Sequence, residues 1–180
     1  NNPSKINIKK YYMKDIINIK PQYVYFDWGS TLGAQGKSKH FFETHDKKYL
    51  NKGTLELLEH LYSKNVPMGI ISNRTMGKPE FIKHLDDTDL LKYFDNILLS
   101  SEGYMKKPHS EMFIKGAEQV KVPPKYILYV GNNYIKDIVT ATKNGYQTAY
   151  MINDNKGYEY DNISNYKIYN MNDISKIISF

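Results

Sequence analysis

Residues 23–32 read Tyr-Val-Tyr-Phe-Asp-Trp-Gly-Ser-Thr-Leu, and this stretch decides the fold of the chain. Its first four residues are apolar and favour β-structure, and turn-forming residues follow soon after Asp27. A short apolar run bounded in this way is typical of a strand that is buried on both faces of a parallel sheet. Asp27 then lies at the carboxyl edge of that sheet, where open α/β folds form their ligand-binding crevices.

The composition is typical of one globular domain. Of the 180 residues, 41 % are hydrophobic and 24 % are charged, a balance found in folded rather than disordered chains. No apolar run reaches the length of about 18 residues that a membrane span needs, so we expect no membrane association. The chain has no cysteine, which excludes disulfides and thiolate metal sites and favours a cytoplasmic protein.

The chain is basic, with a formal net charge of +6. A positive surface attracts phosphorylated or nucleic-acid partners. The lysines are spread along the chain, however, and no nucleic-acid-binding motif is present. The sequence therefore gives no support for a nucleic-acid partner.

Further apolar runs alternate with segments of helical spacing. Strands are predicted at residues 66–71, 96–99, 126–130, 147–152 and 167–170, and helices at residues 52–64, 79–91, 109–120, 135–143 and 174–178. Residues 33–51 are predicted to form a loop or hairpin, and residues 154–165 a loop. This alternation predicts an α/β fold, a doubly wound three-layer sandwich around a mostly parallel sheet. Residues 23–180 would form a single domain, and residues 1–22 an N-terminal arm or extra helix.

Polar side chains follow three of the predicted strands. Asp27 ends the first, Ser72 and Asn73 follow the second, and Asn132 lies beyond the strand at residues 126–130. Because the carboxyl ends of parallel strands share one edge of the sheet, these groups can converge on one crevice. Lys107 lies between the last two strand ends in the sequence, so it is a candidate for the same crevice.

The order of these residues resembles the four signature motifs of the haloacid dehalogenase (HAD) superfamily. Asp27–Thr31 is similar to its Asp-x-Asp-x-Thr motif, and Ile70–Asn73 to its apolar strand ending in Ser or Thr. Lys107–Phe113 matches Lys-Pro-x-x-x-x-Phe, and Gly131–Ile138 resembles Gly-Asp followed by a second Asp. The resemblance covers roughly residues 23–151 and implies a Rossmann-like fold without a large cap domain.

The resemblance also implies a chemistry. Asp27 would attack phosphorus and form an aspartyl-phosphate, Ser72 would hydrogen-bond a phosphoryl oxygen, and Lys107 would offset negative charge. The resemblance further implies substrate binding by Asn73 and by the backbone N–H groups of Trp28, Gly29 and Ser30. The implied cofactor is Mg²⁺, with ligands from Asp27, the Gly29 carbonyl, Asn132 and Asp137.

Two positions depart from the superfamily pattern. Gly29 stands where phosphatases of the superfamily have an Asp that protonates the leaving group and then activates water. Losing such an acid/base costs roughly 10²- to 10⁴-fold in rate. Asn132 stands where a metal-binding Asp is expected, which predicts weaker Mg²⁺ binding.

Three functions fit this pattern. The first is an Mg²⁺-dependent phosphohydrolase that cleaves a phosphate monoester, small or macromolecular. The second is a catalytically impaired scaffold that binds a phosphorylated ligand or a protein. The third is a dehalogenase-like hydrolase, which fits Gly29 but not the short intervals that leave no room for a cap. An open site of this kind is also compatible with a homo-oligomer in which a partner subunit supplies the lid.

Overall fold

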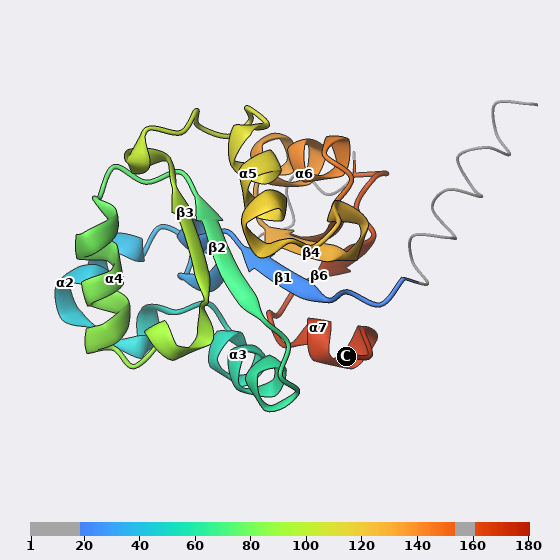
Figure 1. The fold of residues 1–180 in the computed structure, drawn as a ribbon. Coiled ribbons are helices and arrows are strands. Elements are labelled where there is room, and N and C mark those ends of the chain that lie inside the picture. The colour runs from blue at the N-terminus through green and yellow to red at the C-terminus, as the bar shows by residue number, and fades with distance from the viewer. Residues whose placement is uncertain (1–18, 154–160) are drawn as a thin grey trace, which may run out of the picture.

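The computed structural model describes residues 19–153 and 161–180, and a six-stranded parallel sheet forms its centre (Figure 1). The strand order is β3-β2-β1-β4-β5-β6, and every neighbouring pair is parallel. The strands are β1 Tyr23–Phe26, β2 Met68–Ser72, β3 Asn96–Leu99, β4 Ile127–Gly131, β5 Gln147–Met151 and β6 Tyr166–Ile168. In this order the topology switches direction between β1 and β4, which is where such sheets form a crevice.

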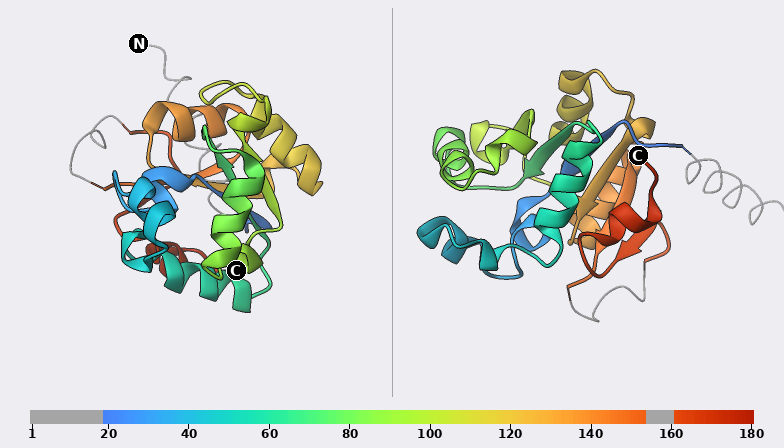
Figure 2. Two further views of the ribbon diagram at one scale, coloured as in Figure 1. Left: turned by 90° about the vertical axis from the view of Figure 1, so that its left-hand side faces the viewer. Right: turned by 90° about the horizontal axis from the view of Figure 1, so that it is seen from below.

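Helices cover both faces of the sheet (Figure 2). They are α2 Ser38–Thr44, α3 Thr54–Ser63, α4 Lys78–Asp87, α5 Glu111–Val120, α6 Thr140–Lys143 and α7 Asp173–Ile177. Short 3₁₀ turns lie at Lys47–Tyr49, Leu91–Tyr93, Ser100–Glu102 and Pro124–Tyr126, and π-helical turns at Trp28–Leu32 and Tyr134–Val139. The predicted doubly wound α/β fold is confirmed.

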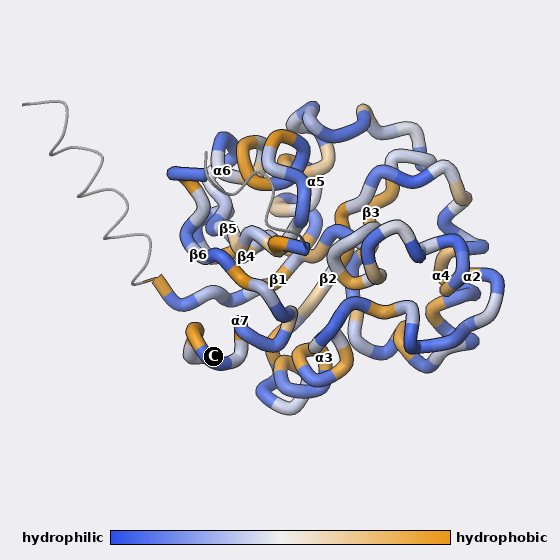
Figure 3. Tube along the Cα trace, turned by 180° about the vertical axis from the view of Figure 1, so that it is seen from behind, coloured by the Kyte–Doolittle hydropathy of each residue, from blue (hydrophilic) through white to orange (hydrophobic). Residues whose placement is uncertain are grey.

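The two faces of β1 contact different helices. Val24 and Phe26 pack with buried residues of α2, α3, α4 and α7, whereas Tyr23 and Tyr25 pack with α5 and α6. All four side chains are at most 2 % exposed, which explains why the sequence of β1 is a continuous apolar run rather than an alternating one. Figure 3 shows the same distribution along the chain, with hydrophobic residues on the strands and on parts of the helices.

The prediction of a loop or hairpin at residues 33–51 is wrong. This segment contains α2 and a 3₁₀ turn, and a single antiparallel bridge between Gly33 and Leu50 closes it. The helix is held by Phe41 and Phe42, which pack on Trp28 with ring centroids 5.3 and 5.6 Å away. Its N-cap has no side-chain hydrogen bond, so the sequence carries no start signal for it.

Two predicted segments lie largely outside the described residues. They are the N-terminal arm, of which residues 19–22 are described, and the loop at 154–165, of which residues 161–165 are described. Gln22 N donates to Tyr126 O at 2.7 Å, so the described end of the arm runs beside the start of β4. Within the described residues, no helix combines the length and the apolar character that crossing a bilayer requires.

Candidate active site

The carboxyl ends of β1, β2 and β4 form one pocket of about 190 Å³. Seven of the predicted site residues line it: Asp27, Gly29, Ser72, Asn73, Lys107, Asn132 and Asp137. They come from four separate segments of the chain. The shared strand edge brings them together, as the parallel sheet requires.

Lys107 is the centre of this pocket and is only 3 % exposed. Its Nζ donates to Asp137 Oδ1 at 2.6 Å and to Asp27 Oδ1 at 3.1 Å. It also donates to the hydroxyl of Tyr129 at 2.8 Å, and that hydroxyl donates to Ile71 O at 2.8 Å. One buried ammonium group therefore neutralises two buried carboxylates, and its donors are fully used.

Burial and charge act in opposite directions on these groups. Burial alone would lower the pKa of Lys107, but the carboxylates of Asp137 and Asp27 raise it above its ordinary value. Burial raises the pKa of Asp137, and the nearby ammonium only partly offsets this. Burial also raises the pKa of Tyr129 well above its usual value, so the phenol stays protonated as a donor. Lys107 accordingly stays charged at neutral pH.

Asp27 keeps one carboxylate oxygen available. Its backbone N–H donates to Val130 O at 2.9 Å, which fixes the residue at the end of β1. Its Oδ1 accepts from Lys107, and its Oδ2 has no hydrogen bond within the described part of the chain. The side chain of Ser72 lines the same pocket, and its hydroxyl has no hydrogen-bond partner among residues 19–153 and 161–180. A carboxylate oxygen and a hydroxyl donor are thus both available to a ligand.

Comparison with known proteins agrees with this arrangement. The sequence model of the haloacid dehalogenase-like hydrolase family matches residues 4–151, which is most of the chain. The chain belongs to this family. It is therefore a member of a hydrolase family, and its parallel sheet and strand-end pocket are those of the HAD fold.

Relatives of this HAD-family chain include phosphatases. It is 28 % identical over 78 residues to phosphoglycolate phosphatase from Escherichia coli K12, covering 43 % of this chain and 30 % of that one. It is 29 % identical over 94 residues to the pyrophosphatase PpaX from Oceanobacillus iheyensis, covering 52 % and 42 %. The chain thus spans less than half the length of the curated relatives it matches.

A solved structure supports the fold. The 2-haloacid dehalogenase from Pseudomonas syringae superposes with a TM-score of 0.70 at 16 % identity, covering 88 % of this chain and 97 % of that one. At this identity the likeness concerns the fold alone. The HAD motifs of this chain must therefore be interpreted from their own geometry.

Asn73 has a structural contact in addition to its predicted place in the pocket. Its side chain lines the pocket, but both ends of its amide bind the backbone of Lys107. Nδ2 donates to Lys107 O at 2.9 Å, and Lys107 N donates to Oδ1 at 2.8 Å. These two hydrogen bonds hold the loop that carries Lys107. The second N–H of the amide is not used by them, and substrate binding by Asn73 stays a prediction.

Trp28 and Ser30 do not line the pocket. The Trp28 side chain is 1 % exposed and packs in the core against the rings of Phe41, Phe42 and Phe81. The carbonyl of Ser30 accepts from Asn153 Nδ2 at 2.6 Å, and Gly29 lines the pocket. The phosphate cradle formed by the backbone N–H groups of Trp28, Gly29 and Ser30 stays a prediction.

The fourth motif is held by its own contacts. Asp137 Oδ2 accepts from the backbone N–H of Asn133 at 3.0 Å, and Asn132 Oδ1 accepts from Thr31 Oγ1 at 3.3 Å. Position 131 requires glycine, because a Cβ there would lie 2.4 Å from the Cβ of Asp137. The glycine of the motif therefore serves close packing.

The donor set fits a weakly held Mg²⁺. Asp27, Gly29 and Asn132 bring carboxylate, carbonyl and amide oxygens to one pocket, and these are the ligands that Mg²⁺ prefers. Asp137, the fourth predicted ligand, lines the same pocket, and its two oxygens, like the amide oxygen of Asn132, accept hydrogen bonds within the protein. Among the described residues, no group of three or more His, Cys, Asp or Glu side chains could hold a metal ion. So few charged ligands predict low affinity for Mg²⁺.

Sequence reasoning missed three residues of the site. Arg74 and Lys136 line the pocket, and Tyr129 binds Lys107 beneath it. Asn133, which also lines the pocket, belongs to the predicted motif at residues 131–138. Arg74 directly follows Asn73, so its position was a usable signal. Tyr129 carried no such signal, because within an apolar strand it is indistinguishable from a core residue.

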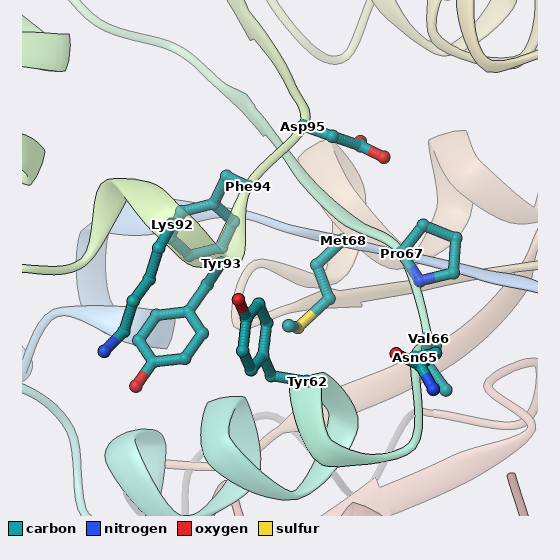
Figure 4. A pocket seen from close by; sticks show the side chains of 9 residues that line it. All are labelled: Tyr62, Asn65, Val66, Pro67, Met68, Lys92, Tyr93, Phe94 and Asp95. Atoms are coloured by element: carbon teal, nitrogen blue, oxygen red, sulfur yellow. The ribbon is translucent and has the colours of Figure 1, made fainter.

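A second cavity, of about 320 Å³, lies at the amino ends of β2 and β3 (Figure 4). Its walls are mostly aromatic and aliphatic side chains, including Tyr62, Met68, Tyr93 and Phe94. It contains none of the predicted site residues and lies at the opposite edge of the sheet from Asp27. The predicted site residues that line a pocket therefore lie at the strand-end pocket and not at this second cavity.

Proposed function

We propose that this HAD-family chain is a phosphohydrolase that works through an aspartyl-phosphate at Asp27. The observation that carries the proposal is the Asp27 carboxylate in a pocket with the Ser72 hydroxyl. Lys107 fixes it through Oδ1, and Oδ2 accepts no hydrogen bond from the described residues. Curated relatives of the chain that are named as phosphatases support it.

The reaction has two displacements. Asp27 Oδ2 attacks phosphorus, an oxygen–phosphorus bond forms, and the bond to the leaving oxygen breaks with its electron pair on that oxygen. Water then attacks the aspartyl-phosphate, which releases phosphate and restores the carboxylate. Ser72 donates a hydrogen bond to a phosphoryl oxygen, and Lys107 holds Asp27 and offsets charge.

Mg²⁺ bound by Asp27, the Gly29 carbonyl and Asn132 would neutralise charge on the phosphoryl oxygens. The chain itself supplies no proton donor at position 29, so we expect slow turnover and better rates with leaving groups that depart unprotonated. The chain between β1 and β2 forms only the turn at Trp28–Leu32, α2, a 3₁₀ turn and α3, and the chain between β2 and β3 only α4 and a 3₁₀ turn. We therefore propose a capless, open site.

The test is phosphate release from p-nitrophenyl phosphate across a series of Mg²⁺ concentrations. Asp27→Asn should abolish release, whereas Asp87→Asn, which removes an exposed carboxylate paired with Lys83, should not change it. Activity should rise with Mg²⁺ and need millimolar concentrations because the site has few charged ligands. Equal rates in the wild type and Asp27→Asn would refute the proposal.

A scaffold that binds a phosphorylated ligand without turnover is the second candidate. Gly29 and Asn132 favour it, since the first removes the acid/base and the second a metal-binding charge. It predicts binding of orthophosphate or vanadate, measured by calorimetry, with no release of phosphate from a substrate panel. Measurable turnover that depends on Asp27 would exclude it.

A further inference from the structure

Arg74 extends directly over the position of the missing acid/base. Its Nη1 lies 3.7 Å from the point where a Cβ on Gly29 would be. The guanidinium packs on the ring of Phe42, with Cζ 5.1 Å from the ring centroid. Arg74 lines both the strand-end pocket and a neighbouring cavity of about 570 Å³. The guanidinium thus lies where these two spaces meet.

The position of Arg74 is fixed, yet among the described residues its guanidinium contacts a ring and no carboxylate. Its backbone N–H donates to Ser100 Oγ at 3.0 Å, and that hydroxyl donates back to Arg74 O at 3.2 Å. Across the described part of the chain, its guanidinium makes no hydrogen bond or ion pair. Burial lowers the pKa of Arg74, and the Asp27 carboxylate only partly opposes this. A half-buried, unpaired guanidinium is costly unless an anion binds it.

The charges around the pocket also favour an anion with more than one phosphate. The carboxylates of Asp27 and Asp137 face three cations, Lys107, Arg74 and Lys136. Lys107 is occupied by the two carboxylates. Arg74 is therefore the half-buried cation that remains available for a substrate group beyond the one that Asp27 attacks.

We propose that Arg74 binds an anionic leaving group, so that the substrate is a phosphoric anhydride whose leaving group is itself a phosphate. This inference rests on the proposed function of the site. A leaving phosphate needs no proton from the enzyme, which accounts for a glycine at position 29. Arg74 offsets the charge that develops on it, by the charge-assisted, bidentate contacts that guanidinium groups make with phosphate.

The step balances for hydrogen pyrophosphate, which carries three negative charges. Asp27 Oδ2 forms a bond to one phosphorus, the bridging P–O bond breaks, and its electron pair leaves on hydrogen phosphate with two negative charges. The aspartyl-phosphate carries the other two charges. Water then hydrolyses it to the Asp27 carboxylate and dihydrogen phosphate, so the enzyme donates no proton in either step.

The experiment compares pyrophosphate with p-nitrophenyl phosphate, whose leaving group carries no phosphate. Arg74→Gln should lower the ratio of kcat/KM for pyrophosphate to kcat/KM for p-nitrophenyl phosphate by about 10- to 100-fold, because a charged hydrogen-bond partner is lost. Arg74→Lys, which keeps the charge but not the bidentate geometry, should give an intermediate ratio. Lys83→Gln, which removes one exposed positive charge paired with Asp87, should leave the ratio unchanged.

Calorimetry provides a readout that does not depend on turnover. Pyrophosphate should bind wild-type protein more tightly than orthophosphate does, and Arg74→Gln should remove that preference. If no substrate is hydrolysed but the preference depends on Arg74, the proposed function fails and the anion site stands. If turnover occurs, and Arg74→Gln lowers kcat/KM for both substrates by the same factor without changing the binding preference, the inference is overturned. If pyrophosphate neither binds nor turns over, both fail.

Discussion

Replacing Lys107 by methionine tests whether the charged groups of the pocket also stabilise the folded protein. Methionine has a similar length but no charge, so Lys107→Met leaves the carboxylates of Asp27 and Asp137 buried without their cation. Lys107 is 3 % exposed and lies 2.6 and 3.1 Å from the two carboxylate oxygens. Removing one member of a buried ion pair costs about 3–5 kcal/mol. For a chain of this size that corresponds to a fall in Tm of roughly 6–20 °C.

The loss of stability in Lys107→Met should grow as pH rises. Without the cation, the pKa of Asp137, which burial already raises, rises further. A folded-state carboxyl with a raised pKa binds its proton more tightly than the unfolded chain does, so stability falls as pH rises from the ordinary pKa through the folded one. The deficit of Lys107→Met relative to the wild type should therefore be smallest near pH 4 and largest above neutrality.

Urea unfolding followed by tryptophan fluorescence, at several pH values, measures this deficit. Lys106→Met is the matched control, because Lys106 is the adjacent lysine and is exposed. Its free energy of unfolding should change by less than about 0.5 kcal/mol. Equal destabilisation by the two substitutions, or a deficit for Lys107→Met that does not vary with pH, would refute the reasoning.

Three further substitutions test individual parts of the site. Gly29→Asp should be tolerated, since the new Cβ would meet Arg74 Nη1 at 3.7 Å, an ordinary contact distance. The new carboxyl group can act as an acid/base, so kcat/KM for an alkyl phosphate should rise by up to about 100-fold. The value of kcat/KM for pyrophosphate should fall, because the new carboxylate pairs with Arg74. Gly131→Ala should cost about 1–3 kcal/mol in urea unfolding and reduce phosphate release, because its Cβ would lie 2.4 Å from the Asp137 Cβ. Trp28→Ala should cost about 3–5 kcal/mol, since that side chain is 1 % exposed; a loss below 1 kcal/mol would place it outside the core.

The fold could be predicted because its signals are local. The strands β1, β2 and β4 are continuous apolar runs that end at Asp27, at Ser72 and at Gly131. Their shared edge then indicates which polar residues come together. The helix α2 was missed because Phe41 and Phe42 are too few to set a helical period and no capping residue precedes them.

The rest of the site depends on information that a sequence does not hold. Lys106 and Lys107 are adjacent and chemically identical, and only the packing shows that Lys107 is the buried one. Trp28 follows Asp27 directly, but the turn after β1 rotates its ring into the core. Arg74 matters because Gly29 leaves space beside it, and such a relation between two distant positions is visible only in three dimensions.

The buried contacts of Lys107 also bear on how a lineage carrying this chain can change. Each single replacement of Asp27, Lys107 or Asp137 would leave an uncompensated charge or a broken network inside the protein, and would be removed by selection for folding alone. Gly29 has no side chain and takes no part in this buried network, so its replacement would not break it. In a descendant without the proposed activity, Asp27 and Lys107 would thus persist longer than a residue at position 29, because their buried contacts also stabilise the fold.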